Sequence, residues 1–206
     1  MQSGGDDLVS IAVADARHAQ MLATRLRELD VCLEVVAGIN SVVVQFDNAI
    51  VDREQVERSI RTALKLPDNS PPQPSGLIEI PIVYGGDGGP DLNAVCQQLD
   101  LTVDEFISLH TSHDYEVDML GFTPGFAYVG GLQERLNVPR LTPPRVQVPS
   151  GSVGIAGGRT GIYALQGPGG WPLIGHTTLA LFDATAANPF TLGPGSRVRF
   201  VAVSGA

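Results

Sequence analysis

A proline-rich segment divides this chain into two parts of different character. Residues 67–76 read PDNSPPQPSG and hold four of the 15 prolines of the sequence. Proline fixes φ and lacks a backbone N–H donor, so such a run interrupts helices and strands and is typical of a linker or a rigid surface crossing. A chain of 206 residues can bury one large core or two small ones. We expect two domains.

Before this segment, the pattern predicts the order βαββα. Asp15 and Asp52 are placed to cap two helices, because an N-cap carboxylate accepts hydrogen bonds from the first free backbone N–H groups. Three runs of alternating or β-branched residues predict strands, over residues 8–14, 32–36 and 42–46. Directly after the proline-rich segment, a further strand is predicted over residues 77–84. If it returns beside the first strand, residues 1–84 form a ferredoxin-like βαββαβ domain.

The remaining residues, 85–206, are predicted to be mainly β, with two short helices near the start. One helix is predicted over residues 92–99, and Thr102 with Glu105 three residues later forms a capping box that opens another. From Tyr115 onward, short apolar runs alternate with glycine and proline turns, and they include residues 162–165, 178–182 and 197–203. Many short strands with frequent turns favour a barrel or a sandwich, so the predicted fold class is α+β.

The second part contains a stretch that is poor in carboxylates. Between Asp118 and Asp183 the only acidic residue is Glu134, although the chain as a whole has a net charge of −9. The same stretch holds four arginines: Arg135, Arg140, Arg145 and Arg159. This local excess of positive charge predicts a bound anion or an acidic partner surface. Bidentate binding of a carboxylate, carbamate or phosphate is expected for at least one of Arg140, Arg145 and Arg159, and solvated loop charge is the alternative.

Half of the 24 glycines lie between Gly121 and Gly170, interleaved with aromatic residues. The glycine runs at 151–161 and 167–170 could present backbone N–H groups to an oxyanion, although tight β-turns need the same glycines. The aromatic residues, with Trp171 among them, are candidates for pocket walls or for plain core. We interpret this region as a site built from loops.

Composition and missing motifs exclude several functions. A pI near 4.7 argues against nucleic acid as the main partner, because phosphate backbones are bound through dense lysine and arginine. No apolar run approaches the ~20 residues that span a membrane, and the N-terminus lacks a signal-peptide layout, so the expected location is cytoplasmic. Lys65 is the only lysine, and neither a P-loop nor a serine-hydrolase elbow is present. A stand-alone ATPase or hydrolase is therefore not expected.

His110 and His113 are three residues apart near the end of the second predicted helix of this part. A third metal ligand at a defined spacing is lacking, so no metal site is predicted. One interpretation is that the two cations lie at the negative end of the helix dipole. Another is that His110 projects into a pocket as a general acid or base.

Specific motifs are spread from residue 84 to residue 171. They read YGG at 84–86, GPDL at 89–92, LHT at 109–111, GFTPGFAY at 121–128, PR at 139–140 and at 144–145, VPSGSVGIAG at 148–157, TGIY at 160–163 and PGGW at 168–171. Together they resemble the family of the 5-oxoprolinase B subunit, also called allophanate hydrolase subunit 1, which includes the histidine-kinase inhibitor KipI. The N-terminal part matches this family by layout only.

The resemblance implies a cyclophilin-like β-barrel carboxyltransferase domain over residues 85–206. It also implies membership of a complex that carries out the ATP-dependent opening of 5-oxoproline to glutamate. The C subunit, which is similar to allophanate hydrolase subunit 2, is the implied obligate partner, and the A subunit is the implied third component. ATP is then used by the complex, because this chain has no nucleotide motif of its own.

Carried over onto this sequence, the family's motif positions fall on seven residues: His110, Phe126, Tyr128, Arg140, Arg145, Ser152 and Tyr163. The resemblance gives His110 and Arg145 as the expected catalytic residues and the other five as expected substrate contacts. Two departures add candidates and leave the substrate open. Arg159 stands where glutamine is usual in the family, and His176 stands where arginine is usual.

Two alternatives to a 5-oxoprolinase component remain open. One is a carboxyltransferase half that acts on urea or a related amide, which requires a biotin-carrying partner. The other is a non-catalytic regulator that binds a histidine kinase.

Overall fold

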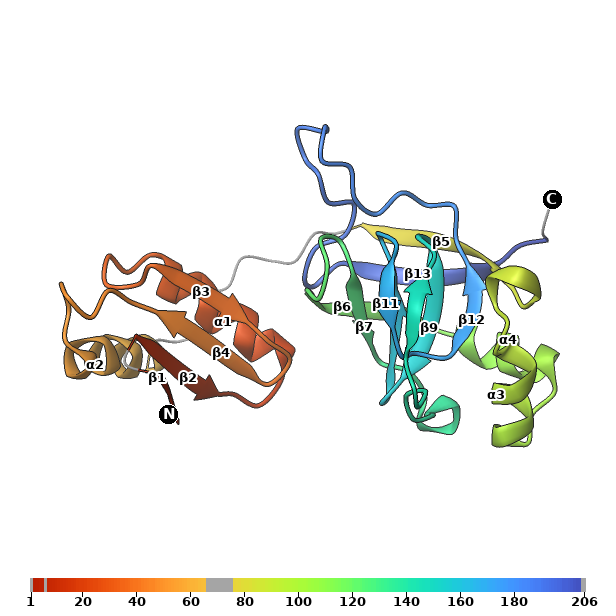
Figure 1. The fold of residues 1–206 in the computed structure, drawn as a ribbon, viewed down its shortest axis with the longest axis horizontal. Coiled ribbons are helices and arrows are strands. Elements are labelled where there is room, and N and C mark those ends of the chain that lie inside the picture. The colour runs from red at the N-terminus through yellow and green to blue at the C-terminus, as the bar shows by residue number, and fades with distance from the viewer. Residues whose placement is uncertain (1, 6, 66–75, 205–206) are drawn as a thin grey trace. The chain divides into compact units, whose positions relative to one another are not determined.

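The computed structural model describes residues 2–5, 7–65 and 76–204. The chain divides into two compact units, one before and one after residues 66–75 (Figure 1). Among the helices of the described ranges, none is both long and apolar enough to cross a membrane.

The first unit combines a four-stranded antiparallel sheet with two helices. In chain order its elements are β1 (Gln2–Gly5), β2 (Leu8–Ala12), α1 (Ala16–Arg27), β3 (Glu34–Ala37), β4 (Ser41–Gln45) and α2 (Arg53–Leu64). Alternate strand residues such as Val9 and Val44 are buried together with helix residues such as Leu22 and Ile60. The two predicted helices are thus present, and their apolar faces form this core.

Both predicted N-caps of the first unit are confirmed. Asp15 accepts a hydrogen bond from the backbone N–H of His18 at 2.9 Å. Asp52 accepts one from the backbone N–H of Gln55 at 2.7 Å. Each bond satisfies one of the amide donors that the first turn of a helix leaves free.

The predicted βαββαβ order is wrong in its last strand. The sheet order is β1-β2-β4-β3, so the edge of β2 that a returning strand would fill is taken by β1, from the start of the chain. The predicted strand at 77–84 exists as β5 (Leu77–Tyr84), but it belongs to the second unit. The expected boundary after residue 84 therefore shifts to the segment before β5.

The second unit is built on a closed barrel of seven strands (Figure 1). The order around the barrel is β10-β7-β6-β13-β5-β12-β9. Besides β5, the strands are β6 (Tyr115–Leu120), β7 (Ala127–Gly130), β9 (Ser152–Ala156), β10 (Arg159–Ile162), β12 (Leu173–His176) and β13 (Arg197–Ala202). The predicted β-barrel is thereby confirmed, whereas its likeness to cyclophilin stays a prediction. β5 is parallel to β13 and antiparallel to β12, so it closes the barrel between them.

Two helices follow β5 and lie together beside the barrel (Figure 1). They are α3 (Leu92–Leu99) and α4 (Val103–Thr111), and short 3-10 turns occur at η1 (Gly86–Gly88) and η2 (Glu134–Leu136). The predicted capping box of α4 is confirmed, because Thr102 and Glu105 bond each other's backbone N–H groups. Phe106 of α4 is fully buried in the barrel core.

A small second sheet was missed by the sequence patterns. It pairs β8 (Arg145–Val148) with β11 (Gly167–Gly169). The run at 178–182, predicted as a strand, forms only an isolated bridge between Phe182 and Phe190. The apolar residues of this run serve the barrel core instead, because Leu181 lies in a loop and is buried in that core.

Candidate functional site

An aromatic cluster lies between the barrel wall and the β8–β11 sheet. It consists of Phe126, Tyr128, Tyr163 and Trp171, and Val148 of β8 and Leu173 of β12 pack with it. The Phe126 ring is the centre, with ring centroids 4.8 Å from Tyr128, 4.9 Å from Tyr163 and 5.9 Å from Trp171. All three contacts are edge-to-face, the geometry that aromatic quadrupoles favour.

Gly161 makes room for this cluster. A Cβ at Gly161 would lie 2.8 Å from both Phe126 Cζ and Trp171 Cζ3, which is closer than atoms can approach. Phe126, Tyr163 and Trp171 are buried, so they form a small core rather than the open walls of a pocket. Burial also raises the pKa of the Tyr163 hydroxyl, which therefore stays protonated near neutral pH.

Arg145 is held beside this cluster by Asp91. Its Nη2 donates to Asp91 Oδ1 at 2.7 Å, and Asp91 Oδ2 accepts from the backbone N–H of Leu173 at 2.6 Å. Asp91 precedes α3 but makes no capping bond to it, so its carboxylate is used wholly in fixing Arg145 to β12. Sequence reasoning missed this role. The available signal was an aspartate at an N-cap position within the GPDL motif.

One nitrogen of Arg145 remains unpaired. Nη1 is buried, and it has no hydrogen-bond partner among the described residues. A second guanidinium lies nearby, because Arg140 is exposed and lies over the Trp171 ring at 5.9 Å from its centroid. Both arginines lie near enough to Tyr163 to lower its pKa, against the larger effect of burial, which raises it.

The prediction that the arginines of this stretch are not neutralised by carboxylates is wrong for two of them. Arg145 pairs with Asp91, and Arg159 pairs with Asp118 through Nε at 2.8 Å. Both carboxylates lie in sequence outside the stretch that contains only Glu134. Charge balance is therefore restored by residues that are distant along the chain and adjacent in the fold.

His110 lies inside the barrel. It is fully buried, its Nδ1 is 2.6 Å from the Tyr84 hydroxyl, and its Nε2 is 2.9 Å from Thr160 Oγ1. Burial lowers the pKa of His110 to about 3, with a smaller contribution from His113, so the ring is neutral. Proton exchange with a substrate, as expected for a general acid or base, does not fit a ring that solvent cannot reach. His113 is instead partly exposed, and its Nε2 lies 3.0 Å from the Gly131 carbonyl oxygen.

Ser152 and His176 are cross-strand partners on β9 and β12. Ser152 is buried, and its carbonyl oxygen accepts from the backbone N–H of Tyr163, so it adjoins the aromatic cluster. His176 is partly exposed, and its Nε2 lies 3.0 Å from the Ser150 carbonyl oxygen. In the ranges that the structure describes, no group of three His, Cys, Asp or Glu side chains is arranged to hold a metal ion.

Five of the nine predicted site residues therefore come together at the aromatic cluster: Phe126, Tyr128, Arg140, Arg145 and Tyr163. We call this cluster, with Asp91, the arginine–aromatic site. Chemically it offers directed N–H donors to an anion, next to the partly exposed Tyr128.

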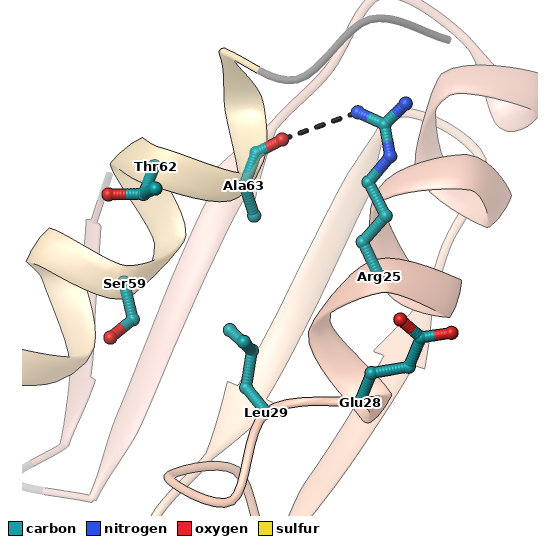
Figure 2. A pocket seen from close by; sticks show the side chains of 6 residues that line it. All are labelled: Arg25, Glu28, Leu29, Ser59, Thr62 and Ala63. Carbon is teal, nitrogen blue, oxygen red and sulfur yellow. Dashed lines mark hydrogen bonds between the residues drawn. The ribbon is translucent and has the colours of Figure 1, made fainter. Parts of the chain in front are cut away.

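A groove of about 380 Å³ lies elsewhere, between α1 and α2 of the first unit (Figure 2). Its lining residues are Arg25, Glu28, Leu29, Ser59, Thr62 and Ala63. Arg25 Nη1 donates to the Ala63 carbonyl oxygen at 3.3 Å and so bridges the two helices. None of the predicted site residues lines this groove.

Comparison with known proteins places the whole chain in one family. Residues 5–192 match the family model of the carboxyltransferase domain, subdomains C and D. The 5-oxoprolinase B subunit of Escherichia coli O157:H7 is 43% identical over 195 residues, which is 93% of this chain and 87% of that protein.

Solved structures agree with this assignment. The crystal structure of TTHA0988 has a TM-score of 0.82 and 32% identity, and it is matched over 97% of this chain. This chain spans only 41% of TTHA0988, so there the matching part is joined to a larger remainder. The urea amidolyase of K. lactis shares the fold, with a TM-score of 0.81 over 98% of this chain and 15% of that one, at 18% identity. This chain belongs to the carboxyltransferase-domain family, subdomains C and D, whose curated members include 5-oxoprolinase B subunits.

Proposed function

We propose that this chain is one component of a 5-oxoprolinase complex and that its arginine–aromatic site binds the substrate carboxylate. The observation that carries the proposal is its identity to the E. coli B subunit over nearly the whole of both chains. The missing P-loop and nucleophile elbow fit a component that shares its chemistry with others. In the proposal, ATP is used by the complex, and the C and A subunits are the partners.

The unpaired nitrogen of Arg145 supports carboxylate binding. A buried donor without a partner costs about 1–3 kcal/mol, and more when it is charged. A carboxylate oxygen at Nη1 would remove that cost, while the bond from Nη2 to Asp91 keeps the guanidinium plane fixed. Because Asp91 already neutralises Arg145, selectivity rests on the direction of the N–H bond rather than on net charge.

Arg140 supplies the net positive charge that the Arg145–Asp91 ion pair lacks. It forms no ion pair with any described carboxylate, and its guanidinium carbon lies over the Trp171 ring at 5.9 Å from the centroid. A small cyclic amide such as 5-oxoproline has one carboxylate and an apolar ring edge, which match these arginines and the partly exposed Tyr128. Holding the carboxylate orients the amide carbonyl for transfer of the ATP γ-phosphoryl group to its oxygen, with release of ADP. Water then adds to the activated carbon, the ring C–N bond breaks with the amine as the leaving group, and hydrolysis of the resulting acyl phosphate gives glutamate and phosphate.

Reconstitution tests this function. Co-expression with the A and C subunits is expected to give 5-oxoproline-dependent ADP release. Arg145→Ala should lower kcat/KM for 5-oxoproline about 10- to 100-fold, the loss that follows from removing a hydrogen bond to a charged group of about 1.5–3 kcal/mol. Arg199→Ala is the matched control, since it removes an exposed arginine that pairs with Asp114 outside the site. Normal turnover by Arg145→Ala would eliminate the carboxylate-binding role.

A carboxyltransferase function is the second candidate, and the description of the matched family model favours it. It requires a biotin-carrying partner in the purified complex. Detection of a biotinylated protein by streptavidin, together with urea-dependent turnover and none on 5-oxoproline, would replace the first proposal with this one.

A further inference from the structure

The loop between β6 and β7 holds a large apolar side chain in a strained and exposed position. Phe122 has φ of +70° and shares positive φ with one other described non-glycine residue, Asp100. Its side chain is 59% exposed. A bulky residue in the left-handed region costs about 1–2 kcal/mol, and such strain is typically retained where binding uses it.

The same loop also contains a buried polar group without a hydrogen-bond partner among the described residues. The Thr123 hydroxyl oxygen is buried, and it has no hydrogen-bond partner in the described part of the chain. Backbone bonds from Thr123 to Gly121 and from Phe126 to Thr123 nevertheless hold the loop in a tight turn. Phe122 therefore lies on a turn that backbone hydrogen bonds hold in place.

The loop that holds Phe122 packs against two other loops. At Gly125 a Cβ would lie 2.7 Å from Phe182 Cβ and 2.9 Å from Ala164 Cβ, so the turn is pressed against both neighbouring loops. Each of these loops also exposes an apolar residue, Leu165 at 37% and Phe190 at 40%. We call Phe122, Leu165 and Phe190 the three-loop patch.

The three-loop patch is continuous with the arginine–aromatic site. The Phe122 ring contacts Phe126 edge-to-face at 5.6 Å, and Phe126 is the centre of the aromatic cluster. A polypeptide that covered the patch would therefore also border the site that holds Arg145 and Arg140.

We infer that the three-loop patch docks a second, different polypeptide of the complex, with Phe122 inserted as an aromatic anchor into an apolar pocket of that partner. In TTHA0988 the part that matches this chain is joined to a remainder that is larger than itself, and the curated relatives are named as subunits. Aromatic residues are enriched at protein–protein interfaces, where a few anchors that enter pockets of the partner supply most of the binding energy. This inference rests on the proposed function, and it names the C subunit as the occupant.

Binding of the C subunit to purified variants of this chain tests the inference. Phe122→Ser and Phe122→Gly should each raise Kd about 10- to 100-fold, the range for loss of a hot-spot aromatic. Phe122→Gly should at the same time leave the Tm of the isolated chain unchanged or raised, because glycine adopts positive φ without strain. Val203→Ser is the matched control, since it replaces an exposed apolar residue outside the three loops and should leave Kd unchanged.

Several outcomes would overturn the inference. An unchanged Kd in both Phe122 variants would do so, as would failure of the C subunit to bind the unaltered chain. A raised KM with unchanged Kd would identify the loop as a substrate lid. A dimer of the isolated chain that Phe122→Ser disperses would assign the patch to a second copy. Phe122-dependent assembly without 5-oxoproline-dependent ADP release would sustain the docking surface and refute the proposed function.

Discussion

At the scale of single residues, His110 shows how a polar side chain is accommodated in an apolar barrel. Both of its ring nitrogens have a hydroxyl partner, Tyr84 on one side and Thr160 on the other. The ring also stacks on Phe200, with centroids 4.6 Å apart. Because a hydroxyl can donate or accept, these two partners satisfy the one donor and the one acceptor of a neutral imidazole.

We therefore expect His110 to make the barrel sensitive to acid. Its pKa of about 3 in the folded state lies below the unfolded value of about 6.5, so below pH ~6.5 the unfolded chain binds a proton that the folded chain does not. Stability should fall as pH drops, by about 2 kcal/mol between pH 6.5 and pH 5. His110→Gln keeps a donor and an acceptor but does not titrate, and its unfolding free energy should lack this loss.

Urea unfolding followed by tryptophan fluorescence measures this difference, because the only tryptophan, Trp171, reports on the barrel unit alone. His18→Gln is the control, since His18 is exposed and belongs to the first unit. Equal pH dependence in the unaltered chain and in His110→Gln would show that His110 is not buried in neutral form.

At the scale of elements, the β6–β7 loop is fixed by a glycine that has two separate requirements. Gly125 has φ of +75°, and a Cβ added there would collide with Phe182 and Ala164. Gly158, in the turn between β9 and β10, has the same φ of +75°, but a Cβ added there would meet no atom within 4 Å. The two positions therefore separate backbone strain from close packing.

Alanine substitutions at these positions should differ in cost. Gly158→Ala is expected to destabilise the barrel by about 1 kcal/mol, from left-handed strain alone. Gly125→Ala adds overpacking and should cost about 2–4 kcal/mol. Chemical unfolding of both variants measures the difference in unfolding free energy. Equal losses would mean that the loop shifts to accommodate a methyl group at Gly125 without further cost.

At the scale of the whole molecule, β5 decides where the barrel begins. It pairs with β13 over six residue pairs and with β12 on its other side, so without it the barrel has two open edges. Open edges leave backbone donors and acceptors unpaired and expose the core.

Truncation tests this boundary. A chain that starts at residue 76 should retain cooperative unfolding by Trp171 fluorescence, whereas one that starts at residue 85 should fail to fold or aggregate. A folded and monomeric product from the shorter chain would show that β5 is dispensable to the barrel.

The sequence by itself determined the local structure and the family. Capping of α1 and α2, the capping box of α4 and the bounds of β5 depend on neighbouring residues, and the motifs that carry the family resemblance are contiguous. Turn-rich runs with few periodic residues gave no signal for the β8–β11 sheet.

Only the tertiary structure decided which residues meet across the chain. Arg145 finds Asp91 from 54 positions away and Arg159 finds Asp118 from 41, so a charge count along the chain could not show that both were neutralised. His110 became a core residue, and β5 joined β13 rather than β2, for the same reason. Burial, ion pairing and strand partners depend on contacts between distant segments, and these are absent from any local pattern.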